Sequence, residues 1–406
     1  MLILQVLRWL LSGIEVVIAM PIVYLFIVSI SAIVVSKRQK TEISYASLAS
    51  QSATFAILIP AHNEVAVLGR LLESLAALDY PKDHYTVYVV ADNCTDTTAE
   101  LVRSTGWVNV HERFDLEKRG KGFALNWLMQ KLDEDRLIYD AYVILDADSV
   151  VAPTFLQEMN RGLSQGAQAL QANNNVLNVT ESSSTALRWI AMTLMNHVRP
   201  LGRNGIGCSS TLTGNGMCLG RSLLLRYPWQ SFSLAEDYQY YLNLMQHGEK
   251  VLYIPKAIVR SEMPSTFAQM RTQDIRWESP DSNQPAWKIA WKLLKAGIVN
   301  RDFVRLEAIA ELLTPPLSYL VGLCLLTLVA SLLVWSLPNL VISLIIISGL
   351  LCYFSTAIYL LRPPHTVFIA LLHAPGFILW KLWVILVLRR SKKRTTEWVR
   401  TSRTAS

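Results

Sequence analysis

Long uncharged apolar runs flank a polar middle region along this chain of 406 residues. Residues 16–35 carry no charged side chain, and neither do residues 317–337 or 340–361. Each run is long enough to cross the ~30 Å hydrocarbon core of a bilayer as a helix. The pattern therefore predicts three membrane-spanning helices, the last two of which form a hairpin at Pro338-Asn339.

The charges beside these runs predict an orientation. Lys37, Arg38 and Lys40 follow the first run, and positive residues stay on the cytoplasmic side, so we expect the polar middle to be cytoplasmic. A fourth apolar run, 366–388, contains His373, Pro375-Gly376 and Lys381. A full crossing there would move the basic tail that follows out of the cytoplasm, so we favour a re-entrant or interfacial segment.

A further amphipathic stretch precedes the hairpin. Trp287, Trp291, Leu294 and Ile298 recur at helical spacing, with lysines on an adjacent face. This pattern is typical of a helix that lies in the membrane interface.

Composition and charge narrow the class of protein. Hydrophobic residues make up 52 % of the chain and charged residues 17 %, below the ~25 % usual in soluble domains. Of the net charge of +7, residues 389–406 supply +6, with seven basic residues against Glu397. A basic tail after an apolar run favours an anionic membrane surface over nucleic acid as its partner. The five cysteines show no CxxC pairing and are expected to be reduced.

The polar middle region predicts an α/β fold. Strand-like runs at 54–60, 87–91 and 141–145 alternate with helical runs at 65–78, 97–104 and 122–132. This order predicts a mostly parallel sheet with helices on both faces, and such sheets bind ligands at the carboxyl ends of their strands. Polar residues gather at those ends, in the segments 60–64, 91–96 and 146–148.

Several of these polar residues suit phosphate and metal chemistry. Asp146 and Asp148 are two apart, a pattern that suits Mg²⁺ or Mn²⁺ but also a helix cap. The segment Arg119-Gly120-Lys121-Gly122 offers cations and close backbone approach to a diphosphate. Glu236-Asp237 opens a helical stretch, where acids also occur as N-caps. Gln273, Arg276 and Trp277 combine groups that hold phosphate and stack on a sugar ring.

Taken in order, the motifs resemble family 2 glycosyltransferases, the inverting GT-A enzymes related to cellulose, chitin and hyaluronan synthases and to ceramide glucosyltransferase. The matching series is PAHNE (60–64), ADNCTD (91–96), RGKG (119–122), DAD (146–148), TGNG (213–216), ED (236–237) and QDIRW (273–277).

The resemblance implies a role for each matching residue. Asp237 would be the general base, and Asp148, helped by Asp146, would hold Mg²⁺ or Mn²⁺. The nucleotide-sugar would be bound by Pro60, His62, Glu64, Asp92, Asn93, Lys121, Asp146 and Asp148. The diphosphate and acceptor would be bound by Gly214, Asn215, Gly216, Glu236, Gln273, Arg276 and Trp277.

The segments of the chain are then expected to have separate tasks. They are an N-terminal transmembrane segment (1–36), a linker (37–53), a GT-A catalytic domain (54–265), the QxxRW segment with interfacial helices (266–316), two transmembrane helices (317–337 and 338–361), a membrane-embedded or re-entrant segment (362–388) and a basic cytoplasmic tail (389–406).

The expected reaction is transfer of a sugar from a UDP-linked donor to an acceptor hydroxyl at the cytoplasmic face of the plasma (inner) membrane. Two acceptors remain open, a glycan in polysaccharide synthesis and a membrane lipid that receives a single sugar. A non-catalytic scaffold of a synthase complex is a third alternative. Expected partners are the donor, the acceptor, the bilayer and partner subunits or further copies of the chain, with no nucleic acid.

Overall fold

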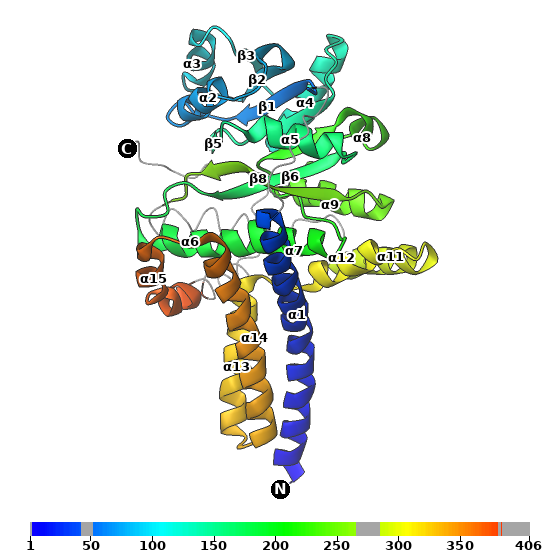
Figure 1. Ribbon diagram of the computed structural model, residues 1–406, viewed down its shortest axis with the longest axis vertical. Coiled ribbons are helices and arrows are strands. Elements are labelled where there is room, and N and C mark those ends of the chain that lie inside the picture. Colours follow the sequence, from blue (N-terminus) through cyan, green and yellow to red (C-terminus); the bar gives the residue numbers. More distant parts are fainter. Residues whose placement is uncertain (1, 42–51, 265–284, 381–382, 384–406) are drawn as a thin grey trace.

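An eight-stranded sheet forms the centre of the part of the chain that the structure describes. This computed structural model describes residues 2–41, 52–264, 285–380 and 383 (Figure 1). The strand order is β3-β2-β1-β4-β7-β6-β8-β5. The strands are β1 (Phe55–Ala61), β2 (Tyr85–Asp92), β3 (Asn109–Arg113), β4 (Ala141–Ile144), β5 (Ser149–Val151), β6 (Ala169–Val176), β7 (Met217–Gly220) and β8 (Val251–Ser261).

The sheet is mixed but mostly parallel. Strands β3, β2, β1 and β4 run parallel to one another, as do β6 and β8. Strand β7 is antiparallel to both β4 and β6, and β5 is antiparallel to β8. Because two antiparallel steps restore the direction, β6 ends at the same edge as β1, β2 and β4. That edge carries the polar motifs, as the sequence predicts.

Helices cover both faces of the sheet, which confirms the predicted α/β architecture. One face buries leucines of α2 (Leu68–Ala76) and the aromatic and apolar residues of α5 (Phe155–Ser164). The other face buries α4 (Lys121–Glu134) and α9 (Glu236–His247). The smaller helices are α3 (Thr98–Ser104), α8 (Arg221–Arg226) and a 3₁₀ turn at Lys82–His84.

Three apolar helices run side by side away from this sheet domain (Figure 1). They are α1 (Leu2–Thr41), α13 (Leu317–Leu333) and α14 (Leu337–Leu361). Among the described residues, Leu2–Arg38 and Leu337–Leu361 are long and apolar enough to cross a membrane. A third crossing requires α12 (Phe303–Leu313) and α13 to count as one span, although they meet at a 67° bend. The run predicted over 317–337 is thus a 17-residue helix that follows a bend.

A layer of short helices joins the apolar helices to the sheet. It consists of α6 (Ser183–Thr193), a π-helical turn (Leu194–Val198) and α7 (Arg199–Gly205). Helix α1 packs directly on α7, where a Cβ on Gly202 would lie 2.0 Å from the Val28 carbonyl oxygen. The hydroxyl of Ser31 in α1 also donates to the Gly202 carbonyl at 2.8 Å. The absence of a side chain on Gly202 therefore lets the two backbones approach closely.

The described residues of the predicted segments 266–316 and 362–388 pack against the rest of the molecule. Helix α11 (Ala286–Val299) buries Ile289 and Leu293 in the same core as α4 and α9, and α12 buries Val304 there. Helix α15 (His365–Leu371) contacts α6 and has only seven residues, too few to cross a bilayer.

A buried ion pair links these layers. Arg203 of α7 donates from Nε to Glu307 Oε1 at 2.6 Å and from Nη2 to Glu307 Oε2 at 2.9 Å. Both side chains are almost fully buried, at 1 % and 2 % exposed. Tyr24 of α1 donates to Glu307 at 2.6 Å, and Arg203 donates to the Tyr241 hydroxyl of α9 at 3.0 Å. One charge pair thus contacts α1, α7, α9 and α12.

We predict that Glu307→Ala destabilises the protein by about 3–5 kcal/mol, because it leaves the Arg203 guanidinium buried without its counter-charge. Thermal unfolding of the detergent-solubilised chain measures this loss. Arg226→Ala is the control, since Arg226 and Glu249 pair at the surface and such pairs contribute about 0–1 kcal/mol. Equal melting temperatures of Glu307→Ala and the wild type would contradict a stabilising role for the pair.

Candidate active site

Lys121 stands at the centre of the candidate site, at the first residue of α4. Its ammonium nitrogen Nζ donates to Asp146 Oδ1 at 2.6 Å and to the Gly214 carbonyl oxygen at 2.6 Å. Glu236 Oε1 lies 3.6 Å from the same nitrogen. These partners come from the end of β4, from the turn before β7 and from the start of α9. The structure therefore brings three of the sequence motifs to one cation.

Asp237 lies against the turn that contains Gly214. A Cβ built on Gly214 would be 2.9 Å from Asp237 Oδ2 and 3.4 Å from Lys121 Nζ. Gly214 also has a φ of +76°, in the left-handed region that other residues rarely adopt. Both the backbone conformation and the space beside Asp237 thus require glycine at this position.

Burial and charge change the pKa values of this cluster. Burial raises the pKa of Glu236 to about 7; Lys121 opposes this rise and Asp237 adds to it. Burial also raises the pKa of Asp237, again opposed by Lys121. For Lys121, burial lowers the pKa, but Asp146 and Glu236 outweigh it and the net pKa is raised. Lys121 therefore stays positively charged and favours the ionised forms of its neighbours.

The buried side chain of Asn215 forms hydrogen bonds with several segments around the site. Its side chain is 1 % exposed, and its Oδ1 accepts from the backbone N–H of Asp146 at 3.1 Å. Its Nδ2 donates to the hydroxyls of Ser149 and Ser261, each at 2.9 Å. These contacts fasten the turn that carries Asp146 and Asp148. The side chain of Asn215, a residue predicted to bind the diphosphate or acceptor, thus makes its hydrogen bonds within the protein.

A second group of predicted residues lies at the ends of β1 and β2. Asp92 is 6 % exposed, and its Oδ1 accepts from Arg113 Nη1 at 2.5 Å. Burial raises the pKa of Asp92, while Arg113 opposes the rise. His62 Nδ1 lies 2.6 Å from the Asp92 carbonyl oxygen and donates to it in the corresponding tautomer. Strand β1 lies between β2 and β4, so this group flanks the Lys121 cluster along the sheet edge.

Asn93 and its neighbours shape the loop after β3. Asn93 adopts a φ of +51°, donates to the Asp115 carbonyl oxygen at 3.1 Å and accepts from the Asp115 N–H at 2.8 Å. Its predicted role in nucleotide binding is thus accompanied by a structural one. Pro60 and Glu64 lie at the end of β1 and in the turn after it, where the Glu64 N–H donates to the Thr98 hydroxyl at 2.9 Å.

Asp146 and Asp148 are the two carboxylates predicted to hold a divalent ion. They lie on either side of Ala147 in a turn closed by the Ser149 N–H, which donates to the Asp146 carbonyl at 3.1 Å. Among the described residues, no group of three or more His, Cys, Asp or Glu side chains is placed to hold a metal. Two carboxylates fit Mg²⁺ or Mn²⁺, which commonly take one or two protein carboxylates together with substrate phosphates.

Gly122 of the RGKG segment has a structural task of its own. A Cβ on Gly122 would lie 2.1 Å from the Ser231 carbonyl oxygen, so this glycine permits close contact with the loop before α9. Arg113 and Gln171 are missed by the sequence reasoning. Gln171 accepts from the Thr213 N–H at 2.9 Å and donates to the Asn215 carbonyl at 2.8 Å. Neither residue lies in a recognisable motif.

Gln273, Arg276 and Trp277 lie outside the described residues.

Gly216 completes the turn and also requires glycine. Its φ is +73°, and a Cβ there would lie 2.7 Å from the Ala172 side chain. The Gly216 N–H donates to the Ile144 carbonyl at 2.9 Å, which ties the turn to the end of β4. Of the predicted residues, the structure thus brings Lys121, Asp146, Gly214, Glu236 and Asp237 into one cluster.

The sequence is similar to one family model and to several curated glycosyltransferases. Residues 52–279, more than half of the chain, match the family model described as "Glycosyltransferase like family 2". The chain is 26 % identical over 234 residues to a probable glycosyltransferase, YdaM, of Bacillus subtilis (strain 168), covering 54 % of this chain and 53 % of that protein. It is 28 % identical over 231 residues to the beta-monoglucosyldiacylglycerol synthase of Nostoc sp. (strain PCC 7120), covering 54 % of this chain and 47 % of that protein. The chain thus spans about half the length of these curated relatives.

A solved structure resembles almost the whole chain. The mannosyltransferase PcManGT from Pyrobaculum calidifontis, in complex with GDP-Man and Mn²⁺, superposes with a TM-score of 0.54 over 94 % of this chain and 100 % of that one. The two sequences are 16 % identical, so this likeness concerns the fold. Together with the family match over residues 52–279, it shows that the chain belongs to glycosyltransferase family 2 and has the GT-A fold.

Proposed function

We propose that this chain transfers a sugar from a UDP-linked donor to an acceptor hydroxyl, with inversion at the anomeric carbon. The observation that carries the proposal is the convergence of Asp146, Glu236 and Asp237 on Lys121 at the carboxyl edge of the sheet. This arrangement combines a carboxylate base with a fixed cation. A hydroxyl nucleophile needs the base to accept its proton, and a nucleotide diphosphate leaving group needs the cation to offset its negative charge.

Asp237 is the base in this proposal. A hydroxyl attacks an anomeric carbon at neutral pH only when a positioned group accepts its proton as the new bond forms. Burial raises the pKa of Asp237, which strengthens it as a base, while Lys121 favours its ionised form. The Gly214 turn leaves open the space beside Asp237 Oδ2 that a side chain would fill.

Lys121 offsets negative charge at the leaving group. Its ammonium is fixed by Asp146 and the Gly214 carbonyl before any donor binds, so little reorganisation is needed during the reaction. Asp148 and Asp146 would hold Mg²⁺ or Mn²⁺, which supplies further positive charge to the diphosphate when bound. Asp92, His62, Glu64, Asn93 and Pro60 would bind the nucleoside part. Gln273, Arg276 and Trp277 would close over the diphosphate and acceptor.

The acceptor lies at a membrane surface in this proposal. The positive charges after the first apolar run support a position of the sheet domain on the cytoplasmic side of the inner membrane. A glycan acceptor is supported by relatives named as glucomannan 4-beta-mannosyltransferases, about 24–26 % identical to this chain. A lipid acceptor is supported by the relatives named as beta-monoglucosyldiacylglycerol synthases and by the packing of the sheet domain on apolar helices.

We predict that Asp237→Asn lowers the transfer rate at least ~10²-fold, because the amide cannot accept the hydroxyl proton. Membranes that contain the variant are incubated with a panel of radiolabelled UDP-sugars plus Mg²⁺ or Mn²⁺. UDP binding to the purified chain, measured by calorimetry, should remain close to that of the wild type. Asp133→Asn, at an exposed position of α4, is the matched control. Near-normal turnover in Asp237→Asn would remove this residue from the base role.

The products of the same incubation identify the acceptor. Solvent extraction separates lipid from polymer, and chromatography sizes each fraction. A ladder of oligosaccharides is expected for a glycan acceptor, whereas one labelled glycolipid is expected for a lipid acceptor. Absence of transfer from every UDP-sugar, with transfer from another nucleotide-sugar, would contradict the UDP-linked donor.

The raised pKa of Glu236 predicts how the stability of the folded protein depends on pH. In the unfolded chain this carboxyl ionises near 4.5, whereas in the folded protein it keeps its proton up to about pH 7. Because the folded protein binds this proton more tightly than the unfolded chain, protonation of Glu236 stabilises the folded state. This contribution is complete below pH 4.5 and is lost as the pH rises through 7. We expect the melting temperature of the wild type to fall between pH 5.5 and 8 and that of Glu236→Gln to fall less. Glu134→Gln, at an exposed position, is the control. Equal pH slopes of Glu236→Gln and the wild type would be inconsistent with this pKa.

A further inference from the structure

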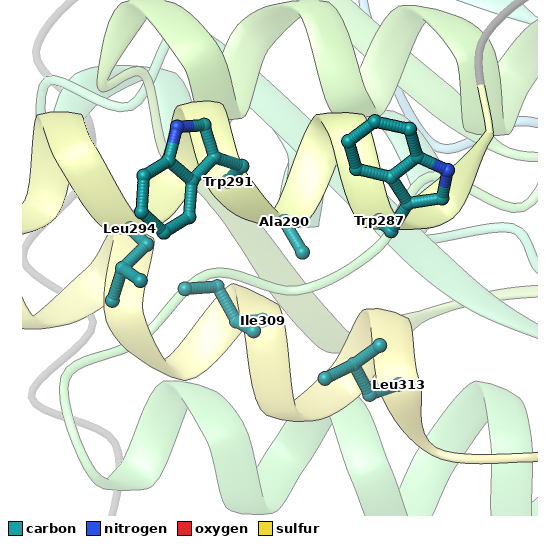
Figure 2. A pocket seen from close by; sticks show the side chains of 6 residues that line it. All are labelled: Trp287, Ala290, Trp291, Leu294, Ile309 and Leu313. Atoms are coloured by element: carbon teal, nitrogen blue, oxygen red, sulfur yellow. The ribbon is translucent and has the colours of Figure 1, made fainter.

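An apolar pocket lies between α11 and α12, on the far side of the sheet domain from β1–β3. Figure 2 shows the six side chains that line it, four from α11 and two from α12, namely Trp287, Ala290, Trp291, Leu294, Ile309 and Leu313. Its volume is about 520 Å³, within the range of about 300–1,000 Å³ that is typical of ligand sites. All six lining side chains that the structure describes are apolar or aromatic, so they suit an occupant that is apolar where it enters.

Three of the six residues that line the pocket are largely exposed. Trp287 and Trp291 are each 66 % exposed, and Leu313 is 59 % exposed. The opposite side of α11 is different, since Ile289 and Leu293 are buried against the domain core. Helix α11 therefore presents one apolar side to the protein and a second one to its surroundings.

Cations lie beside this exposed apolar side. Helix α11 carries Lys288, Lys292 and Lys295 and no acidic residue. The ammonium of Lys288 lies 5.6 Å from the centre of the Trp287 ring, which itself lines the pocket. A ligand whose apolar chain enters the pocket would thus have its polar end within reach of positive charge.

The pocket also lies where the apolar helices begin. Leu313 is the last residue of α12, and α13 starts at Leu317 after a bend of 67°. Helices α11 and α12 lie across the direction of α1, α13 and α14 (Figure 1). If these helices enter a bilayer, the pocket opens at the level of the lipid head groups.

We propose that this pocket binds one acyl chain of an anionic phospholipid, with the head-group phosphate held by the lysines of α11. Chain and head group contribute separately: burial of methylenes supplies affinity, and the positive charge selects an anionic over a zwitterionic lipid. Such a lipid would fix α11 and α12 at the membrane surface. The binding does not depend on glycosyl transfer, so it is tested apart from the proposed reaction.

The test is a lipid titration of the purified full chain in detergent, followed by native mass spectrometry. The probe is dioleoylphosphatidylglycerol. Dioleoylphosphatidylcholine has the same chains without net charge, and glycerol 3-phosphate has the charge without chains. We expect one phosphatidylglycerol to bind more tightly than phosphatidylcholine, and glycerol 3-phosphate not to displace it. Displacement by glycerol 3-phosphate would show a phosphate site only and would overturn the proposal.

Two variants separate the two contributions. Ala290→Phe fills the pocket and should weaken phosphatidylglycerol binding about tenfold, the effect of keeping a few methylenes exposed. Leu225→Phe, at an exposed position of α8, is its control. The double variant Lys288→Glu, Lys295→Glu should lose the preference for phosphatidylglycerol while still binding phosphatidylcholine. Lys256→Glu, at an exposed position of β8, is the charge control.

A second pocket variant keeps the proposal testable if Ala290→Phe fails to fold. Leu313→Ser replaces an apolar wall residue with a polar one and is measured in the same way if Ala290→Phe aggregates. Unchanged phosphatidylglycerol affinity in the pocket variant would overturn the proposal. Asp237→Asn should bind phosphatidylglycerol like the wild type, which distinguishes a failure of this proposal from a failure of the proposed transfer reaction.

Discussion

The Arg203 guanidinium is buried where water cannot solvate it, and Glu307 is its counter-charge. An unpaired charge in such a place is costly, so the helices that carry the two residues are constrained to remain together. The constraint extends further, because Tyr24 of the first apolar helix binds Glu307 and Tyr241 of α9 binds Arg203. Helix α9 begins with Glu236 and Asp237. One buried pair therefore connects the helix that carries Glu236 and Asp237 to the first apolar helix.

The candidate site also depends on a buried cation that is paired with carboxylates. Asp146, Glu236 and Asp237 are brought close together, although like charges repel and burial disfavours ionisation. Lys121 makes the arrangement possible, since its pKa is raised and it stays charged among them. In the proposed reaction, this cation, already held in place, offsets a second cluster of negative charge, the diphosphate of a donor.

Sheet domain and apolar helices form one packed body. Helices α11 and α12 share a core with α4 and α9, while α6 and α7 share a core with α1, α13 and α14. The motifs proposed to bind a donor and the surfaces suited to a bilayer are therefore held in a fixed relation. A site built in this way suits an acceptor that is presented at a membrane surface, which is consistent with either acceptor class proposed above.

The sequence by itself determined the features that depend on neighbouring residues: the apolar runs, the alternation of strands and helices and the placement of the acidic motifs at strand ends. Those features follow from local periodicity. Tertiary structure alone decided which partner each polar group has. Asp92 pairs with Arg113, Lys121 with Asp146 and Arg203 with Glu307, across 21, 25 and 104 residues of chain. It also placed Asn215 inside the site and packed α11 and α12 into the core with α4 and α9. Such pairings depend on strand order and on close backbone contacts, which periodicity along the chain does not specify.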